Sequence, residues 1–183
     1  MMQTPVLQTP RLMLRFFELT DAPAVLRLVG DRAIAETTLN IPHPYEEGMA
    51  EQWISTHREK FEDGELMNFA ITLHTTGELI GAIGLLINRD FDRGELGYWI
   101  GKPYWGNGYC TEAARAILRY SFVEINLNRI YANHFIENLA SGNVMKKIGM
   151  KKEGVLRQHI KKWDQYHDEV VYGILKQEWK AIN

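Results

Sequence analysis

The period of the apolar positions changes several times along the chain, and each period predicts one kind of element. Residues 11–16 alternate polar and apolar side chains, which is typical of a half-buried strand. Residues 20–29 combine a Thr-Asp cap with apolar positions three and four apart, and Gly30 ends this predicted helix. Residues 45–62 predict a second helix, polar on most of its surface.

The rest of the chain predicts a mixed sheet. Two more helices are expected, one with an apolar face from Ala114 to Ile125 and one from near Asn138 to Gly149. Six further strands are expected, over residues 69–73, 79–87, 95–100, 129–134, 154–163 and 167–176. Seven strands with interspersed helices predict an α+β fold, in which helices pack on both faces of a sheet.

Composition and length narrow the class of protein. The chain has 183 residues, is 45% hydrophobic and carries a formal net charge of −2, which is the composition of a folded protein. This length favours one domain over residues 1–183. Its apolar runs are too short to span a membrane and no secretory signal is visible, so we expect a cytoplasmic protein without a membrane partner. Near-neutrality gives no electrostatic help with nucleic acid, and none is expected as a partner.

Cysteine and histidine usage argues against a metal cofactor. Cys110 is the only cysteine, which excludes an internal disulfide and a multi-cysteine metal site. The histidines at 43, 57, 74 and 134 do not have the spacing of metal ligands. We therefore expect no metal in this protein.

The small net charge hides two opposed segments. Residues 31–65 hold nine acids against three bases, whereas residues 146–163 hold seven bases against Glu153 alone. Charge runs of this kind are most often solvated surface. The functional alternative is that the acidic segment faces a cation and the first lysines of the basic segment face phosphate.

The junction between residues 100 and 112 carries the most specific local signal. It joins a predicted strand to a predicted helix through Gly106-Asn-Gly108, and backbone N–H groups at such a junction bind anions such as phosphate. No Lys-Ser or Lys-Thr pair follows, so it is not a Walker loop. A dinucleotide fingerprint would need glycine at Thr111 and an acid near Arg129. A simple glycine turn is the other interpretation.

Several motifs in order resemble the GNAT superfamily of acyl-CoA N-acyltransferases, closest to its Rim-type branch, which includes ribosomal-protein N-terminal acetyltransferases. They are Thr9-Pro-Arg-Leu-Met-Leu-Arg15, Glu95-Leu-Gly-Tyr-Trp-Ile100, the segment from Trp105 to Ala113, the segment from Asn138 to Met150, and Tyr166-His-Asp-Glu-Val-Val-Tyr172. The resemblance implies a single-domain GNAT-like fold with a mixed, mostly antiparallel seven-stranded sheet, helices on both faces and a splayed central strand pair.

The resemblance also implies how coenzyme A would bind. Backbone at Trp99 and Ile100 would pair with the pantetheine arm, Asn138 would hydrogen-bond that arm, and Lys147 would lie toward the nucleotide. The pyrophosphate loop would comprise Trp105, Gly106, Asn107, Gly108, Tyr109 and Cys110, with Thr111. Trp105 replaces the family's usual Gln or Arg, which puts a side-chain contact to phosphate in doubt, and Cys110 replaces a Gly or Ala.

Acetyl transfer to an amine requires a base, and the sequence offers two. Glu95, on the strand that leads into the loop, is the first candidate; pairing with a nearby Arg or Lys is its structural alternative. His159 is the second, with an ordinary strand histidine as its alternative. The resemblance places a glutamate of the Rim-type ribosomal enzymes at Ile160, so that base is missing here.

Two further residues are candidates for catalysis. The resemblance places Ser141 near the thioester sulfur, where it would act as general acid; a helix cap is the alternative. Cys110 lies at the start of a predicted helix, where the helix N-terminus can lower the pKa of a thiol, so it is a candidate nucleophile. No histidine partner can be assigned to it.

The sequence therefore predicts an enzyme, an acetyl-CoA-dependent N-acetyltransferase that transfers acetyl to a primary amine by direct attack. The acceptor is expected to be a protein N-terminus of the ribosomal-protein type. A small amine (polyamine, amino acid or antibiotic) and a catalytically weak acyl-CoA-binding module are the alternatives. The sequence leaves monomer and homodimer open.

Overall fold

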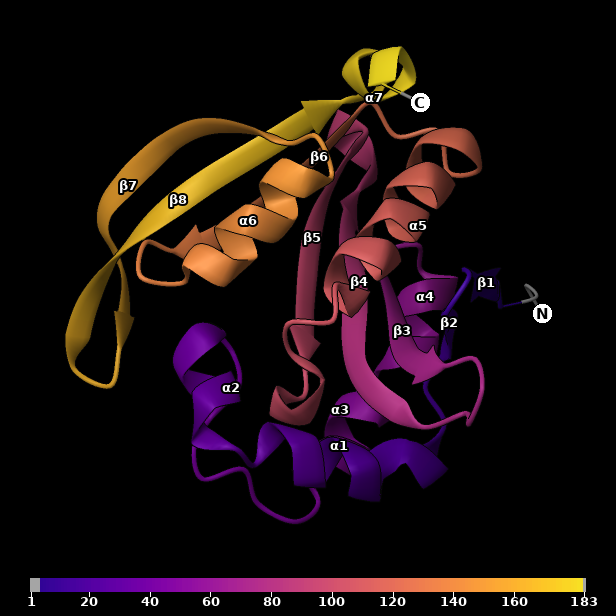
Figure 1. Cartoon of the computed structure of the whole chain (residues 1–183), viewed down its shortest axis with the longest axis vertical. Coiled ribbons are helices and arrows are strands. Elements are labelled where there is room, and N and C mark those ends of the chain that lie inside the picture. Colours follow the sequence, from indigo (N-terminus) through magenta and orange to yellow (C-terminus); the bar gives the residue numbers. More distant parts are fainter. Residues whose placement is uncertain (1–3, 183) are drawn as a thin grey trace.

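A computed structural model describes residues 4–182, and its centre is one eight-stranded sheet in the order β1-β2-β3-β4-β5-β6-β8-β7 (Figure 1). Every neighbouring pair is antiparallel except β5 and β6, which are parallel. The strands are β1 Leu7–Gln8, β2 Leu12–Phe16, β3 Leu66–Leu73, β4 Leu79–Asn88, β5 Arg93–Ile100, β6 Arg129–Phe135, β7 Lys151–Lys162 and β8 Gln165–Leu175.

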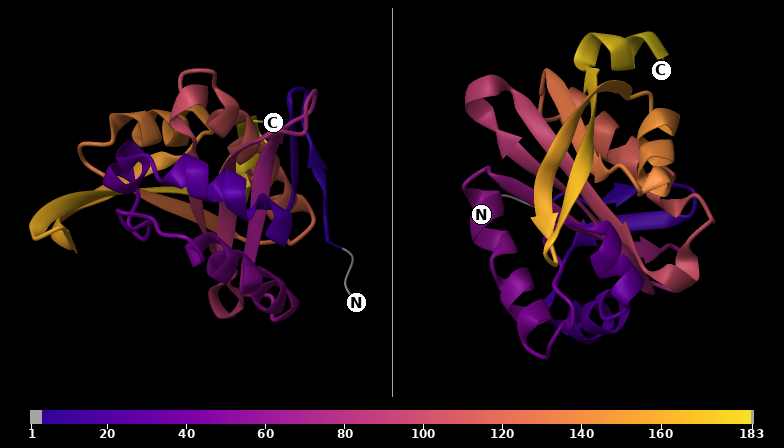
Figure 2. Two further views of the ribbon diagram at one scale, coloured as in Figure 1. Left: turned by 90° about the horizontal axis from the view of Figure 1, so that it is seen from below. Right: turned by 90° about the vertical axis from the view of Figure 1, so that its left-hand side faces the viewer.

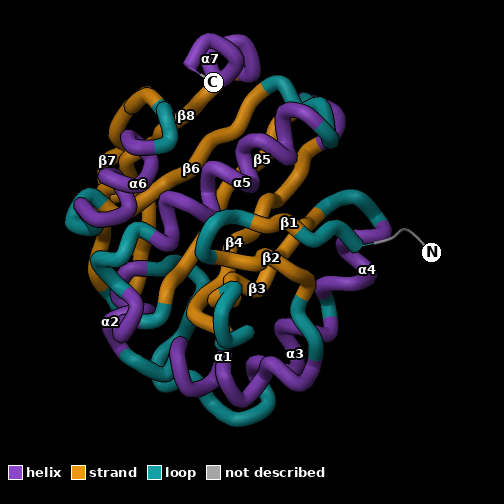
Figure 3. Tube along the Cα trace, turned by 45° about the vertical axis from the view of Figure 1, so that its right-hand side comes forward, coloured by secondary structure: helices purple, strands orange, loops and turns teal. Residues whose placement is uncertain are grey.

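Helices cover both faces of this sheet, as Figures 2 and 3 show. The α-helices are α1 Ala22–Val29, α2 Arg32–Thr37, α3 Met49–Ser55, α4 His57–Glu62, α5 Tyr109–Val123, α6 Leu139–Lys147 and α7 Lys176–Ile182. Three 3₁₀ turns, η1 Leu19–Asp21, η2 Arg89–Phe91 and η3 Lys102–Tyr104, complete the elements. No helix within residues 4–182 is long and apolar enough to cross a membrane.

Two apolar clusters hold the layers together. On one face, Ile117 and Phe122 of α5 pack with Leu85 of β4 and other apolar strand residues. On the other face, Val25 of α1 and Ile54 of α3 form a second cluster with strand residues. Helical spacing in α5 and alternation in the strands place these residues inward, so burial of apolar surface fixes which face each helix covers.

The expected splayed strand pair is confirmed. β5 and β6 are paired only where Arg93–Glu95 run beside Arg129–Tyr131. Beyond this short ladder β5 continues to Ile100 against β4, whereas β6 continues to Phe135 against β8. Figure 1 shows the two strands diverging, with α6 lying over the gap between them. On the side that faces the gap, the backbone of residues 96–99 has no strand partner and is open to a ligand that can supply hydrogen bonds.

The seven predicted strands are present, and the structure adds an eighth, the two-residue β1. The helix expected over 45–62 is divided into α3 and α4. Thr56 between them donates its hydroxyl to Trp53 O at 3.0 Å, a local bond that competes with the helical ladder. α2 was not predicted because six residues are too few to show a period; Asp31 caps it by accepting from Ala33 N at 2.9 Å. Residues 1–3 and 183 of the expected domain lie outside the described part of the chain.

The β7–β8 hairpin extends from the body of the molecule toward α2 (Figures 1 and 2). Near its tip, the buried Lys162 ammonium donates to backbone carbonyls at the end of α2 and in the loop that follows. The acceptors are Ala35 O at 2.5 Å, Thr38 O, Leu39 O at 3.3 Å and Ile41 O at 3.2 Å. The hairpin and α2 are therefore fastened together.

Candidate active site

The glycine-rich loop bends into α5 as the sequence predicted. Gly106 and Gly108 have φ values of +78° and +76°, a left-handed conformation that side chains rarely adopt. Gly108 is the N-cap of α5, and the first helical bond that reaches it is Glu112 N to Gly108 O at 3.1 Å. The N–H groups of the first turn have no acceptor within the helix, so they form a partly positive anion site at the mouth of the strand gap.

A distant brace fixes this loop. The Glu112 carboxylate accepts from Thr9 Oγ1 at 2.7 Å, from Arg11 N at 2.9 Å and from Arg11 Nε at 2.6 Å. Arg11 Nη1 in turn donates to Asn107 O at 3.0 Å. Burial alone would raise the pKa of Glu112, but the hydrogen bonds from Thr9 and Arg11 outweigh it and lower that pKa. These residues were missed as loop supports because about a hundred positions separate the partners.

Two side chains of the loop, those of Trp105 and Asn107, donate hydrogen bonds to backbone carbonyls of the protein. The indole Nε1–H of Trp105, the only donor of this side chain, donates a hydrogen bond to Ile100 O at 2.5 Å. Asn107 Nδ2 donates to Tyr104 O and to Trp105 O, both at 3.1 Å. Trp105 therefore contributes no side-chain donor to a phosphate. Backbone N–H groups remain as the anion ligands.

On the α6 side of the gap, two hydroxyl groups meet. Tyr98 OH of β5 lies 2.8 Å from Ser141 Oγ of α6, and it also donates to Ser141 O at 3.2 Å. Burial raises the pKa of Tyr98, so its phenol stays protonated across ordinary assay conditions. The sequence singled out Ser141; Tyr98 was missed as its partner because only the fold brings the two positions together.

Asn138 is committed to other contacts. Its Oδ1 accepts from Ser141 N at 3.1 Å and caps α6, and its Nδ2 donates to Thr37 O at 3.3 Å. Both polar atoms therefore bond within the protein, which makes Asn138 a link between α6 and the end of α2. A bond to a pantetheine arm would have to be shared with these contacts.

Cys110 lies in the first turn of α5, at the helix start as expected, but it does not have the properties of a nucleophile. Burial raises the pKa of its thiol well above the ordinary value, the opposite of what an activated cysteine needs. Its position in the first turn places it beneath the loop. The side chain is a small packing residue against the apolar cluster of that face.

The opposite side of the gap carries carboxylates. Glu95 is the last residue of β5 that pairs with β6, and its Oε2 accepts from Tyr131 OH at 3.0 Å. No Arg or Lys partner is found for Glu95 among the described residues, so the expected ion-pair alternative is not what holds it. Glu169 of β8 lies farther along, with its Oε2 3.8 Å from His159 Nε2. Glu169 was missed because nothing local marks it.

The basic segment does not form one surface. Lys162 is buried against the α2 carbonyls, Lys151 pairs with Glu178 at 2.5 Å, and Lys161 pairs with Asp164 at 2.9 Å. Lys147 is exposed at the end of α6, where its carbonyl accepts from Arg115 Nη2 of α5 at 3.0 Å. Lys146 and Lys147 lie in the last turn of α6, and Lys152 and Arg157 are exposed on β7.

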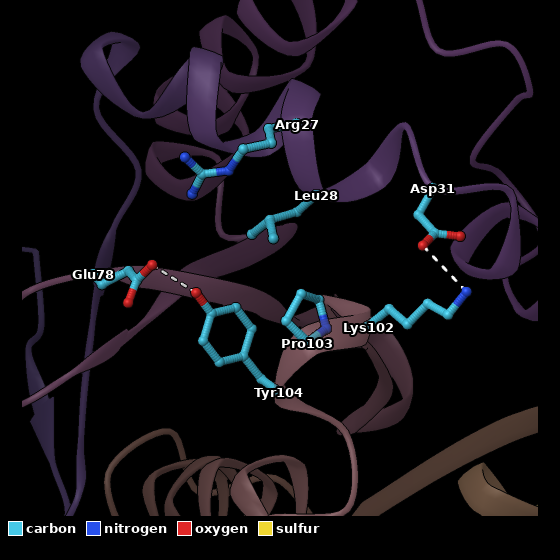
Figure 4. A pocket seen from close by; sticks show the side chains of 7 residues that line it. All are labelled: Arg27, Leu28, Asp31, Glu78, Lys102, Pro103 and Tyr104. Atoms are coloured by element: carbon cyan, nitrogen blue, oxygen red, sulfur yellow. Dashed lines mark hydrogen bonds and ion pairs between the residues drawn. The ribbon is translucent and has the colours of Figure 1, made fainter.

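A separate hollow of about 330 Å³ lies between α1 and η3 (Figure 4). Two pairs of its lining residues interact: Tyr104 OH donates to Glu78 at 2.6 Å, and Lys102 lies 3.5 Å from Asp31. It shares residues 102–104 with the approach to the loop but contains neither the hydroxyl pair nor the carboxylates. The catalytic candidates therefore surround the strand gap and not this hollow. In the described part of the chain, no group of His, Cys, Asp or Glu could hold a metal ion.

A sheet opened between two parallel strands, with a glycine-rich helix start at its mouth, is the architecture of an acetyltransferase. The chain belongs to the GNAT acetyltransferase family, whose domain profile matches residues 11–151.

Three similar proteins illustrate the relationship. The uncharacterized N-acetyltransferase YnaD of Bacillus subtilis is 36% identical over 172 residues, which are 93% of this chain and 97% of YnaD. The uS5-alanine N-acetyltransferase of Escherichia coli, which acts on a ribosomal protein, is 28% identical over 66% of this chain and 63% of its own. The structure of the ribosomal L7/L12 α-N-protein acetyltransferase RimL, solved with coenzyme A, superposes with a TM-score of 0.87 at 17% identity, covering 93% of this chain and 98% of RimL.

Proposed function

We propose that this N-acetyltransferase, formed by the whole chain 1–183, transfers acetyl from acetyl-CoA to the α-amino group of a protein N-terminus in the cytoplasm. One observation carries the mechanism: the open strand pair has carboxylates on one face and a hydroxyl pair on the other. An amine needs a base where it enters, and a thiolate needs a proton donor where it leaves. The ribosomal-protein acetyltransferases among its relatives support this acceptor class.

Backbone groups would bind the cosubstrate. The N–H groups from Gly106 to Thr111, with Asn107, Gly108, Tyr109 and Cys110 between them, would hold the pyrophosphate at the start of α5. The outward edge of β5 at Trp99 and Ile100 would pair with the pantetheine arm. Asn138 would reach the same arm, and Lys147 would approach the nucleotide.

The gap also arranges the chemistry. Glu95 would accept a proton from the acceptor's ammonium, directly or through water, a step that is typically worth about 10²–10⁴-fold in rate. Unpaired N–H groups of β5 would polarise the thioester carbonyl. Ser141, bonded to Tyr98, would donate a proton to the departing thiolate. Direct attack needs no covalent enzyme intermediate, which agrees with the buried, protonated thiol of Cys110.

The acidic segment would attract the acceptor. Glu46, Glu47 and Glu51 lie on or before α3 and are exposed, whereas Glu36 and Glu62 are paired with Arg32 and Arg58 of their own helices. Unpaired surface acids raise the local concentration of a cationic amine. Reversal of charge at the three exposed glutamates should raise the Michaelis constant of the acceptor without changing that of acetyl-CoA.

A free-thiol release assay tests the proposed function. Purified protein and acetyl-CoA are mixed with peptides that begin with Ala, Ser or Met, with the same peptides blocked by an N-terminal acetyl group, and with spermidine, lysine and an aminoglycoside. We expect thiol release with free-N-terminal peptides and none with blocked ones. Release only with a small amine would favour the small-amine alternative. Micromolar binding of acetyl-CoA without release from any amine would favour the binding module.

A further inference from the structure

Three side chains with acceptor oxygens, Glu95 of β5, Asn133 of β6 and Glu169 of β8, lie on one face of the sheet around β6. Alternate residues of a strand point to the same face, so Tyr131, Asn133 and Phe135 share one. The register sets Glu95 beside Tyr131 and Glu169 opposite Phe135, and directly paired residues project to the same side. Residues of the other parity in β6 and β8 pack in the cluster under α5 and α6. The three acceptors therefore lie on the face away from α5 and α6.

The middle acceptor lacks a donor. Asn133 Oδ1 is buried and has no hydrogen-bond partner among the described residues. Buried carbonyl oxygens in native proteins are nearly always paired, so an unpaired one beside two carboxylates needs an N–H group from elsewhere. A primary ammonium supplies three such groups and a charge that the carboxylates attract.

Glu169 is a largely enclosed carboxylate. Its side chain is only 12% exposed. The titratable groups around it are His159 of β7, Glu95 of β5 with its partner Tyr131, and His167 two positions before it on β8. Burial raises its pKa, His159 partly offsets this, and the charge of Glu95 raises the pKa again. A carboxylate in such surroundings binds a proton more readily than an exposed one.

We propose that the ammonium of the acceptor docks between Glu95, Asn133 and Glu169, and that Glu169 is a catalytic base that takes its proton. This inference rests on the proposed function and changes one step of it: Glu169, in place of Glu95, is the group that takes the proton from the ammonium. Glu95, held by Tyr131, and Asn133 orient the nitrogen. His159, at the solvent side, passes the proton from Glu169 to water.

The step balances without a further reactant. An N–H bond of the ammonium breaks and its proton moves to a Glu169 oxygen, which leaves a neutral amine. The amine lone pair forms a C–N bond to the thioester carbonyl, and the C–S bond breaks with its electrons going to sulfur. The second proton passes from the nitrogen to water as the amide forms. The thiolate gains one proton from the Ser141–Tyr98 pair, and this pair takes a proton back from water.

Glu169→Gln is the informative variant, because it keeps the shape and removes the base. With acetyl-CoA and the best peptide or spermidine as acceptor, kcat/KM should fall about 100-fold. The rise of kcat/KM with pH that reports Glu169 should disappear. Hydroxylamine, which is neutral at pH 7 and needs no base, should be acetylated by Glu169→Gln at the wild-type rate. Asp168→Asn, one residue away on the opposite face, is the matched control and should match the wild type.

Binding gives a readout that does not depend on turnover. Calorimetry on the CoA-loaded protein, titrated with an Ala-starting peptide and with spermidine, should show affinity reduced at least tenfold in Glu169→Gln and in Asn133→Leu, with CoA affinity unchanged. Wild-type affinity and pH profile in Glu169→Gln would overturn the inference while thiol release still supports the proposed function. A wild-type protein that binds neither probe would also overturn it, and absence of thiol release would then count separately against the proposed function.

Discussion

At the scale of single residues, the Tyr98–Ser141 contact is the most specific chemical feature of the gap. Two hydroxyls 2.8 Å apart form one donor unit, since either can pass a proton to the other. We predict that Ser141→Ala and Tyr98→Phe each lower kcat at least tenfold at saturating acetyl-CoA, and that the double variant is no slower than the worse single one. Steady-state kinetics in a double-mutant cycle measures this.

The control for this prediction is Ser121→Ala. Ser121 Oγ donates to Ile117 O at 2.7 Å inside α5, so its hydroxyl is also bonded but lies away from the gap. Its kcat should be that of the wild type. Unchanged kcat in Ser141→Ala, with CoA still bound, would remove the serine from the mechanism and leave it as part of the α6 cap.

The glycine at the start of α5 makes a second prediction at this scale. A Cβ at Gly108 would meet only Arg11 Nη2 at 3.7 Å, so Gly108→Ala brings strain of the left-handed backbone without a clash. We expect a loss of about 1 kcal/mol in stability and at least tenfold weaker CoA binding, because relief of the strain would turn N–H groups away from the anion. Urea denaturation and calorimetry measure the two effects. Gly154→Ala, in a strand with open space around it, should change neither.

At the scale of elements, periodic patterns predicted the strands and helices that are long enough for the local sequence to show their period. Alternation identified the seven longer strands, and helical spacing identified α1, α5 and α6. β1 and α2 have two and six residues, too few to show a period, and their place depends on tertiary contacts.

The same distinction between local motifs and tertiary contacts explains which residues of the site the sequence predicted. The loop glycines and Ser141 belong to a local motif, so the sequence indicated them. Glu169 reaches the face of Asn133 only through the β6–β8 register, and a bulge between Leu156 and Ile160 shifts the hairpin. No spacing in one sequence predicts that shift. The Arg11–Glu112 brace is likewise a product of the β2–α5 packing.

The tie between the hairpin and α2 can be tested at its lysine. Lys162→Met removes the ammonium and leaves several backbone carbonyls without their donor. We expect a loss of about 3 kcal/mol, because hydrogen bonds from a buried charged group are among the strongest. The midpoint of urea denaturation measures this loss, and faster amide hydrogen exchange at residues 35–41 would locate it. Lys161→Met is the matched control: its exposed pair with Asp164 should be worth under about 1 kcal/mol. Equal stability of the two variants would contradict the role of the tie.

At the scale of the whole molecule, the two charged segments do not act as two uniform surfaces. Several bases of the basic segment are in ion pairs or, for Lys162, bonded to backbone carbonyls. Part of the acidic segment is paired with arginines of the same helices. What remains in the two segments is a few exposed glutamates near α3, two lysines near the end of α6, and Lys152 and Arg157 on β7. Net charge therefore says little about the site, and buried titratable groups matter more for stability.

His57 is such a group, and it predicts how global stability depends on pH. The residue is 4% exposed, its ring packs edge to face with the rings of Trp53 and Phe17, and its Nε2 lies 3.0 Å from Asn68 Nδ2. Burial, with a smaller effect from Lys60, lowers the pKa of His57 from 6.5 to about 4. The folded state therefore keeps this histidine neutral at a pH where the unfolded chain has already bound a proton.

The sign follows from proton binding. Between pH 6.5 and 4 the unfolded state binds more protons at this position than the folded state does. The free energy of unfolding therefore falls as pH falls through that window, and the full stabilising contribution of the neutral histidine is present above pH 6.5. A shift of this size corresponds to about 3 kcal/mol.

His57→Phe keeps an aromatic ring against Trp53 and Phe17 but cannot titrate. Its unfolding free energy, measured by urea at a series of pH values, should decline less steeply than that of the wild type from pH 6.5 to 4. Carboxylates titrate in both proteins, so the difference between the two curves isolates His57, and the exposed His74→Gln variant should follow the wild-type curve. Parallel curves for His57→Phe and the wild type would show that the buried ring does not set the acid stability of the fold.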